Sequence, residues 1–377
     1  MAIPRFSILI PFLCLVCFAC IPVEYNSLSN IEQNNELIQS YANGFRIIKQ
    51  NNFRKILIYS PWSKNTLLNE FVLWPDSIPL PDSLKTKPVI LTPVNKLITL
   101  SSTQWAATIL LDETDIIKGV SETSYIQNEL IRRQIEVNAI TEVAVNGTYK
   151  PELIIQIHPD LILYSPDPSG IPEVLIRSGS ALLAWPDYFE NHPLGRAEWV
   201  KVMGVLLQKE KEADSIFDNI SQSYKNLRKL TETITIRPTI FADKEFSGQW
   251  YVPGGKSYMA CLFQDAGADY LWKENTSTAS FPLGIEAILS KAHNADFWRI
   301  AQAANGSYSY NDLKNENEIY ASFKAFEQKK IIFSNTATTA YFERSQFEPH
   351  IVLSDLIFLM HPELLPDYQP VYYHILQ

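Results

Sequence analysis

The sequence predicts an α/β protein in which two doubly wound lobes are joined by a single long helix, with a small N-terminal β extension. Between Lys209 and about Thr231 the chain has the pattern of one amphipathic helix, without glycine or proline, that carries Phe217 and Tyr224 on its apolar face. A helix of roughly 23 residues is about 34 Å long. Because short strand and helix patterns alternate on both sides of it, it would be the only covalent link between two lobes. Clefts between such lobes are common ligand sites.

The same order of strand and helix patterns occurs in both halves of the chain. In each half a buried strand pattern comes first, and a later helix is followed at once by another strand. Residues 41–92 differ, because prolines keep their β-like runs short. We therefore expect a β-rich extension packed on the first lobe (41–92), an N-terminal α/β lobe (93–208), the connecting helix (209–233) and a C-terminal α/β lobe (234–377), with a separate first-lobe helix over Leu194 to Leu207.

The N-terminus has the outline of a secretory signal peptide over residues 1–19. Arg5 precedes an apolar run from Phe6 to Phe18, which is shorter than the roughly 20 residues of a membrane span. The small Ala19 before Cys20 is typical of bacterial lipoproteins, in which the cysteine is lipidated and becomes the mature N-terminus. Residues 20–40 are then a lipid-anchored tether, and the protein is periplasmic, held at the inner or outer membrane. An ordinary cleaved signal peptide is the alternative.

The remaining cysteines agree with this compartment. Cys14 and Cys17 fall inside the signal peptide and Cys20 takes the lipid, so Cys261 is left alone and no disulfide can form in the mature chain. Cys261 lies in an apolar, helix-like stretch that is typical of a buried and inert thiol.

Composition and motifs exclude several classes of function. A net charge of -9 and a pI near 5.3 argue against a nucleic-acid partner. The 6 histidines form no HExxH, HxH or Cys/His cluster, and the chain has no GxSxG, P-loop or GxGxxG motif. We therefore predict a protein that is not an enzyme and that has neither a cofactor nor a metal centre of its own.

Candidate ligand-binding residues are hydroxyl, aromatic and glycine residues at strand ends and in loops. Ser102 and its neighbours follow the first strand of the first lobe, where they would offer donors or simply cap a helix. In the loop 246–257, adjacent glycines allow close approach of a ligand and aromatic rings offer flat faces, although these rings would instead plug the lobe if the loop is a tight turn. The complete set is Ser102, Thr103, Tyr125, Tyr164, Trp185, Gln249, Trp250, Tyr251, Gly254, Gly255, Lys256, Tyr341, Phe342 and Arg344, the last of which is available for a carboxylate or phosphate. For Tyr125, Tyr164 and Trp185 a structural role is the alternative.

Three stretches carry a resemblance to a known family. Residues 192–199, the run 251–272 and residues 361–366 resemble the Bacteroidetes branch of ABC-transporter substrate-binding lipoproteins for iron complexes and cobalamin, of the class III helical-backbone type. The resemblance extends from about Gly44 to Tyr373. It implies limited hinge motion, a shallow cleft for a bulky chelate, and docking on an inner-membrane permease driven by an ATPase. It also implies a docking carboxylate on each lobe: Glu173 on the first and Asp312, or else Glu316, on the second. Solvated helix-cap carboxylates are an equal interpretation of all three.

These observations lead to one functional hypothesis. The protein would be a monomeric, lipid-anchored solute-binding component of an ABC importer that captures cobalamin or a ferric siderophore. A chelate already encloses its metal, so the lack of a histidine cluster argues against the free zinc and manganese binders of the family. The alternatives are a chelatase-like tetrapyrrole enzyme, which needs a His/Glu pair in the cleft, and a surface accessory lipoprotein that keeps the fold.

Overall fold

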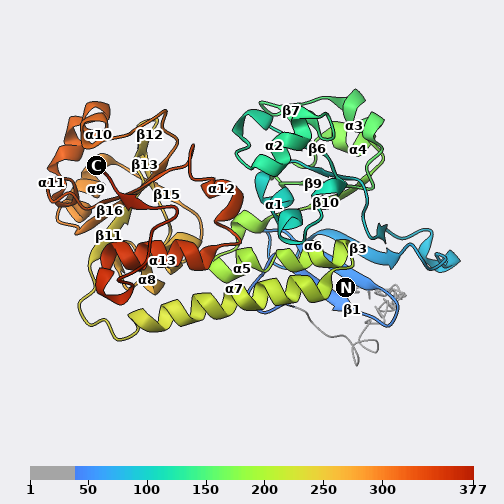
Figure 1. Cartoon of the computed structure of the whole chain (residues 1–377), viewed down its shortest axis with the longest axis horizontal. Helices are drawn as coiled ribbons and strands as arrows, with labels where there is room; N and C mark the ends of the chain where they lie inside the picture. Colours follow the sequence, from blue (N-terminus) through green and yellow to red (C-terminus); the bar gives the residue numbers. More distant parts are fainter. Residues whose placement is uncertain (1–38) are drawn as a thin grey trace, which may run out of the picture. The chain divides into compact units, whose positions relative to one another are not determined.

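The computed structural model describes residues 39–377 (Figure 1). The predicted signal peptide, the lipidation site Cys20 and nearly all of the predicted tether lie outside the described residues. Among the described helices none has both the length and the hydropathy that crossing a membrane requires.

The first described element is a four-stranded sheet in the order β1-β2-β3-β4, antiparallel except between β3 and β4. Alternate residues such as Phe45, Ile47, Ile56 and Ile58 are fully buried, as the period of a strand with one covered face requires. The Asn69 side chain donates to the carbonyl of Leu182 and accepts from the amide of Ala184, so the sheet is attached to an edge strand of the first lobe. The strands are β1 (Phe45–Lys49), β2 (Arg54–Tyr59), β3 (Leu67–Pro75) and β4 (Val89–Thr92).

Two buried carboxylates attach the start of the described chain to the first lobe. Glu198 accepts backbone N–H bonds from Ser40, Tyr41 and Ala42 at 2.7 to 2.8 Å. Glu190 accepts from the next two amides and from the indole of Trp199. Burial raises the pKa of Glu190, and the amide donors act in the opposite direction.

The first lobe is built on a six-stranded sheet in the order β10-β9-β5-β6-β7-β8, parallel except for β8. The chain leaves β5 toward β6 but leaves β9 toward β10 on the other side, so the topological switch point lies between β5 and β9. The strands are β5 (Leu97–Thr99), β6 (Ile117–Ser121), β7 (Thr141–Val145), β8 (Thr148–Tyr149), β9 (Leu161–Tyr164) and β10 (Ala181–Ala184), and the helices are α1 (Ser102–Leu110), α2 (Glu129–Glu136), α3 (Pro151–Ile157) and α4 (Glu173–Arg177).

The second lobe has a five-stranded sheet in the order β14-β11-β16-β17-β18, parallel except for β18, and its switch point lies between β11 and β16. A small antiparallel sheet of β12, β13 and β15 adjoins it. The strands are β11 (Thr239–Ala242), β12 (Glu245–Phe246), β13 (Gln249–Val252), β14 (Asp269–Tyr270), β15 (Phe281–Leu283), β16 (Phe297–Gln302), β17 (Ile331–Asn335) and β18 (His374–Ile375). The helices are α8 (Tyr258–Asp265), α9 (Ile285–Ala292), α10 (Tyr310–Glu316), α11 (Lys324–Glu327), α12 (Tyr341–Arg344) and α13 (Pro349–Met360).

The long connecting helix is α7 (Glu210–Thr231), which confirms the predicted helix within one residue of its expected start. Two short helices, α5 (Pro193–Ala197) and α6 (Val200–Leu206), occupy the predicted separate segment, and Gln208 at φ 57° ends it in the left-handed region. Figure 1 shows α7 packed against α6 and α13. Helices therefore cover the sheets of both lobes, and the α/β class with two lobes and one long helix is confirmed.

The α6–α7 contact leaves no room for an added methyl group at Gly204. A Cβ at this position would lie 2.5 Å from the Cβ of Ala213 on α7. We expect Gly204→Ala to lower the free energy of unfolding, because overpacking of about 1–3 kcal/mol exceeds the ~0.5–1 kcal/mol that alanine gains in a helix. Urea denaturation measures the change. In an Ala213→Gly background the same substitution should no longer destabilise the protein, and a Gly204→Ala protein as stable as the parent would contradict the prediction.

Candidate ligand cleft between the lobes

A cavity of about 660 Å³ within residues 39–377, called the main cavity below, lies where strand ends of both lobes face each other. First-lobe residues follow β5, β6 and β9, so the cavity adjoins the switch point of the first sheet, where ligands of such sheets bind. Its first-lobe lining is Leu100, Ser101, Ser102, Trp105, Ser121, Glu122, Ser124, Tyr125, Ile126, Gln127 and Ser165. Its second-lobe lining, which follows β16 and β17 and includes α12, is Ala303, Asn305, Thr336, Ala337, Ala340, Phe342 and Glu343.

Hydroxyl groups dominate the polar part of the first-lobe wall. Five serines contribute, and each lies at or just beyond the carboxyl end of a buried strand. Ser121 donates to the carbonyl of Leu100 at 3.0 Å, and Ser102 donates across the lobes to the carbonyl of Phe342 at 3.2 Å. Ser124 and Ser165 are exposed. The wall can therefore exchange uncharged hydrogen bonds with the periphery of a ligand.

Two exposed aromatic rings come from opposite lobes. Tyr125 of the first lobe is 74% exposed and Phe342 of α12 is 63% exposed, whereas Trp105 is buried in the wall. Exposed rings of this size in a concave site provide apolar contact area that water leaves readily. Both were predicted as ligand contacts, and the fold brings them to the same cavity.

The lobes are tied together at this cavity by the side chain of Gln127. Its amide donates to the carbonyl of Thr336 at 2.9 Å and accepts from the N–H of Ala340 at 3.0 Å, while its own backbone N–H donates to Glu343 Oε1 at 2.6 Å. We call these three bonds the Gln127 clasp. Glu343 is 5% exposed, and burial raises its pKa while the amides of Gln127 and Asn128 act in the opposite direction. No sequence signal pointed to Gln127 or Glu343.

Two further contacts join the lobes. Gln346 donates to the carbonyl of Thr103, and the guanidinium of Arg196 stacks 4.2 Å from the ring centre of Tyr258 on α8. Arg196 and Thr103 also lower the pKa of Asp187, through the charge of the first and a hydrogen bond with the second. Asp187 is 1% exposed, and its Oδ2 has no hydrogen-bond partner among the described residues. Burial raises the pKa of Asp187 to about 7, and Arg196 only partly offsets the effect.

Several predicted ligand residues lie in the core instead. Trp185 packs against Trp199 and is fully buried, Tyr164 is 4% exposed, and Tyr341 is buried with its hydroxyl bonded to that of Tyr373. Trp250 is 1% exposed and donates to the carbonyl of Ala242, so this ring plugs the lobe, as the alternative interpretation held.

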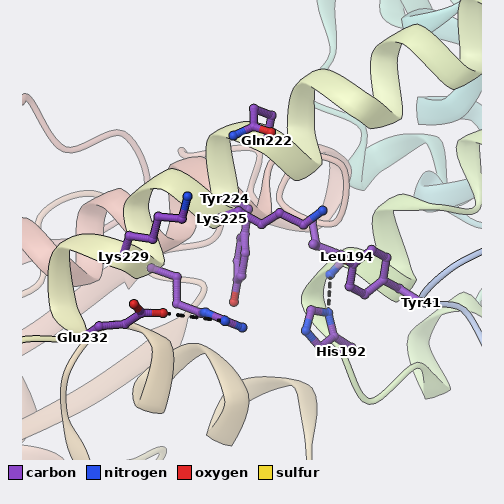
Figure 2. Close-up of a pocket in the computed structure, with 9 residues that line it drawn as sticks. Tyr41, His192, Leu194, Gln222, Tyr224, Lys225, Lys229 and Glu232 are labelled. Carbon is purple, nitrogen blue, oxygen red and sulfur yellow. Dashed lines mark hydrogen bonds and ion pairs between the residues drawn. The ribbon is translucent and has the colours of Figure 1, made fainter.

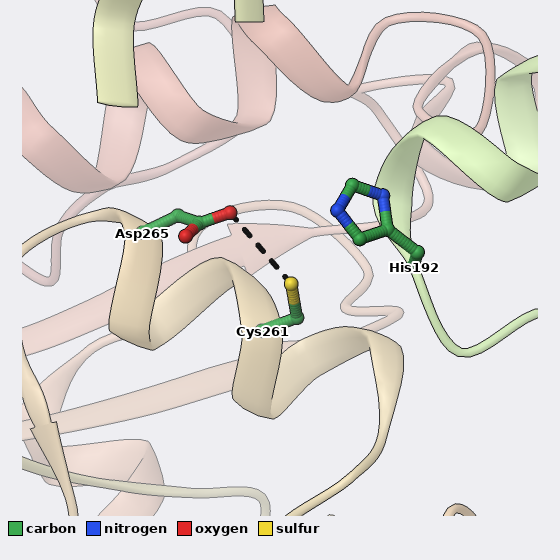
Figure 3. A group of neighbouring side chains, drawn as sticks. All are labelled: His192, Cys261 and Asp265. Atoms are coloured by element: carbon green, nitrogen blue, oxygen red, sulfur yellow. Dashed lines mark hydrogen bonds between the residues drawn. The ribbon is translucent and has the colours of Figure 1, made fainter. Parts of the chain in front are cut away.

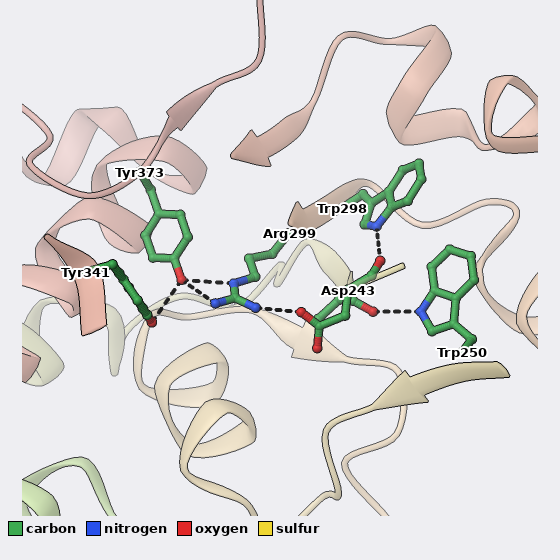
Figure 4. A network of polar contacts seen from close by, with 7 residues as sticks. Asp243, Trp250, Trp298, Arg299, Tyr341 and Tyr373 are labelled. Atoms are coloured by element: carbon green, nitrogen blue, oxygen red, sulfur yellow. Dashed lines mark hydrogen bonds and ion pairs between the residues drawn. The ribbon is translucent and has the colours of Figure 1, made fainter. Parts of the chain in front are cut away.

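In the second lobe, polar and aromatic groups fill the switch point and keep Trp250 and Tyr341 buried. Arg299 on β16 pairs with Asp243, which follows β11, at 2.7 Å, and it also donates to the hydroxyl of Tyr373 (Figure 4). The indole of Trp298 donates to the carbonyl of Asp243 at 2.7 Å. The second lobe therefore has no space for a ligand between β11 and β16, and its contribution to the cavity comes from the ends of β16 and β17 and from α12.

The glycine pair of the 246–257 loop also has a structural explanation. A Cβ on Gly254 would lie 2.2 Å from the carbonyl oxygen of Ser277, and one on Gly255 would lie 2.4 Å from that of Asn275. Both glycines are thus required by close backbone packing within the lobe. Gln249, Tyr251 and Lys256 are exposed but do not line the cavity, and Arg344 forms an ion pair with Glu348 at 2.9 Å.

A smaller cavity of about 270 Å³ lies between α7 and the start of α5 (Figure 2). Its lining includes Lys225, Arg228 and Lys229 of α7, together with Tyr41 and His192. The wall is therefore rich in positive charge, unlike that of the main cavity.

His192 also approaches Cys261 and Asp265 of α8, and the three offer potential ligand atoms within 4.8 Å of one another (Figure 3). However, His192 Nδ1 accepts the N–H of Leu194 at 3.0 Å, so the neutral ring carries its proton on Nε2, the nitrogen that a metal would need. Burial raises the pKa of the Cys261 thiol, which donates to Asp265 at 3.6 Å. These bonds favour an interlobe packing contact over a metal site.

The predicted docking carboxylates lie on helices at the surface. Glu173 begins α4, is 74% exposed and pairs with Arg177. Asp312 forms a capping box with Ser309 at the start of α10, and Glu316 at its end contacts Lys244 and the hydroxyl of Tyr308.

The raised pKa of Asp187 predicts how the stability of the folded protein depends on pH. Because the folded protein binds this proton more tightly than the unfolded chain, Asp187 makes stability fall as pH rises from about 4 to about 7. Asp187→Asn should flatten this slope and raise the free energy of unfolding above pH 7 by on the order of 1–4 kcal/mol. Denaturant titrations across pH measure it. Asp167→Asn is the control, because hydrogen bonds from Ser169 lower the pKa of that exposed carboxyl; equal slopes in the parent and Asp187→Asn would refute the assignment.

Comparison with known proteins shows which sequences and structures this chain is similar to. An uncharacterized lipoprotein of Methanocaldococcus jannaschii is 26% identical over 314 residues, which cover 78% of this chain and 73% of the relative. A periplasmic heme binding protein from Pseudomonas aeruginosa matches with a TM-score of 0.59 at 16% identity, covering 75% of this chain and 98% of that one. The protein of an ABC-type Fe3+-hydroxamate transport system from Saccharomonospora viridis matches with a TM-score of 0.54 at 17% identity, covering 71% and 94%.

The two solved structures share the fold of this chain, and a family profile shows to which protein family its sequence belongs. The profile of the periplasmic binding proteins matches residues 97–336, which run from β5 to the end of β17 and so contain both switch points and α7. This match covers more than half of the chain and includes most of the residues that line the main cavity. The chain therefore belongs to the periplasmic binding protein family.

Proposed function

We propose that the protein is the solute-binding component of an ABC importer, which captures a metal chelate, cobalamin or a ferric siderophore, and delivers it to an inner-membrane permease. The observation that carries this proposal is the cavity of about 660 Å³ between the lobes, with hydroxyls on one wall and exposed aromatic rings from both lobes. Its volume is within the range of small-molecule sites, and the mixture of apolar surface with a few polar groups is what such sites use.

The polar groups of the lining suit a ligand that brings its own metal coordination. None of the residues that line the cavity is histidine or cysteine, and serine hydroxyls bind uncharged oxygen and nitrogen atoms at the edge of a chelate. Proteins with this fold include one named for heme binding and one named for Fe3+-hydroxamate transport, which supports a metal complex as the cargo. A chelatase would need a histidine base in the cleft, and the lining offers none.

The proposed location is the periplasm, with a lipid at Cys20 that anchors a monomer to the inner or outer membrane. The sequence pattern at the N-terminus supports the anchor, and the archaeal relative is also named as a lipoprotein. For docking on the permease we propose Glu173 and Asp312. Both are exposed; Glu173 pairs with Arg177, and Asp312 accepts hydrogen bonds from Ser309.

A thermal-shift panel on the mature chain tests the proposal. Cyanocobalamin, haem, ferric siderophores, zinc and manganese are each added in excess. A chelate at about a hundred times its Kd should stabilise the protein by roughly 2.7 kcal/mol. A clear shift with bare zinc and none with any chelate would overturn the proposal.

The two exposed rings predict which variants lose affinity. Phe342→Ala and Tyr125→Ala should each weaken binding of the chelate found in the panel by about threefold to tenfold, because an aromatic contact contributes ~0.5–1.5 kcal/mol. Isothermal titration calorimetry gives the Kd values. Phe246→Ala is the matched control, since Phe246 is also 74% exposed but does not line the cavity. Equal Kd values for all four proteins would place the ligand elsewhere.

A further inference from the structure

The lining of the main cavity contains negative but no positive side chains. Among its residues the charged ones are Glu122 and Glu343, and none is lysine, arginine or histidine. A ligand that carries carboxylate or catecholate charge would leave water for a wall that offers it no cation. Placing like charges together in a partly desolvated site is unfavourable.

The cations on nearby elements are committed to other partners. Arg344 on α12 pairs with Glu348 at 2.9 Å, and Arg299 on β16 pairs with Asp243 at 2.7 Å. Lys150, next to β7, pairs with Glu142 at 3.0 Å. Each would have to give up a formed ion pair to neutralise an anionic ligand. The lining therefore has no cation of its own, and these three are already held in ion pairs.

The two carboxylates, Glu343 and Glu122, differ in their hydrogen-bond and ion-pair partners. Glu343 is buried and bonded to the amide of Gln127, so it serves the clasp between the lobes. Glu122 forms no ion pair within the described chain, and its side chain accepts one bond, from the N–H of Gly147 at 3.2 Å. It directly follows β6 and has φ 55°, a left-handed conformation that is uncommon for a residue other than glycine and that recurs at binding sites.

We propose that the cleft selects uncharged or cationic metal chelates over anionic ones, and that Glu122 is the specificity-determining residue that pairs with an ammonium group of the ligand. This inference rests on the proposed function and narrows its substrate class. It favours a ferric hydroxamate with a pendant amine, or an uncharged complex, over a ferric tris-catecholate or haem with its two propionates. The ligand ammonium would supply the cation that the lining lacks.

Matched ligands separate charge from shape. The ferric complex of desferrioxamine B carries an ammonium group, and acetylation of that amine removes the charge but keeps the chelate. We expect the mature protein to bind the ammonium form about threefold to tenfold more tightly at low salt, and the difference to shrink as added salt screens the pair. Ferric enterobactin and haem should bind more weakly than either hydroxamate. Fluorescence quenching or calorimetry gives the four Kd values.

Variants then assign the effect to Glu122. Glu122→Gln should abolish the preference for the ammonium form, and Glu122→Lys should reverse the preference. Glu152→Gln is the control: it removes one negative charge from an exposed residue of α3, and this variant should bind both forms as the parent does. Equal binding of the two hydroxamates by the parent, a tighter complex with the catecholate, or a preference that survives Glu122→Gln would each overturn the inference. If the neutral hydroxamate and cobalamin also fail to bind, the proposed function fails with it.

Discussion

The arrangement of the two lobes depends on how they are held beside α7. That helix packs on α6 of the first lobe and α13 of the second, and the contact at Gly204 is too close for any larger residue. The Gln127 clasp adds direct hydrogen bonds between the lobes at the cavity itself. With about 0.5–1.5 kcal/mol for each of the three bonds, opening the clasp costs ~1.5–4.5 kcal/mol before any packing is lost. Under the proposed function, closely packed helices and these bonds would restrict the hinge, and the cavity would be largely complementary to the ligand in this arrangement.

The two lobes make unequal use of the same topology. Both sheets reverse their strand order, but only the first leaves its switch point open to the cavity. In the second, the Asp243–Arg299 pair and the surrounding tryptophans occupy the corresponding space. A buried pair of this kind is costly to break, since removing one partner leaves an unpaired charge. The second lobe therefore contributes to the site through the short α12 and the strand ends beside it, and a rule based on topology alone locates only half of the site.

Much of the fold could be predicted because it is encoded in local periodicity. The bounds of α7 follow from apolar residues at helical spacing in a run free of glycine and proline, whereas prolines flank α3 and the strand β9. The site was harder. Tyr125, Phe342 and Ser102 were predicted as ligand contacts and line the cavity. Trp250 and Trp185 were predicted on the same grounds, as aromatic residues at strand ends or in loops, but they are buried. Whether an aromatic ring is exposed depends on contacts with residues distant in sequence, such as Trp298, which no local pattern reveals. Gln127 and Glu343 were missed for the same reason, because their role exists only across the lobe interface.

The restrained hinge bears on the charges that the cavity can accept. A site that hinges little cannot gather distant cations around an incoming ligand, so the residues already in its wall determine which charges it accepts. In this wall the serines follow the strand ends of one lobe, the aromatic rings come from both, and one carboxylate, Glu343, is used to join them. Glu122 is then the wall's remaining carboxylate, and it belongs to the lobe whose switch point is open. The restraint on the hinge and the negative charge of the wall thus act together, since the first fixes the geometry in which the second is presented.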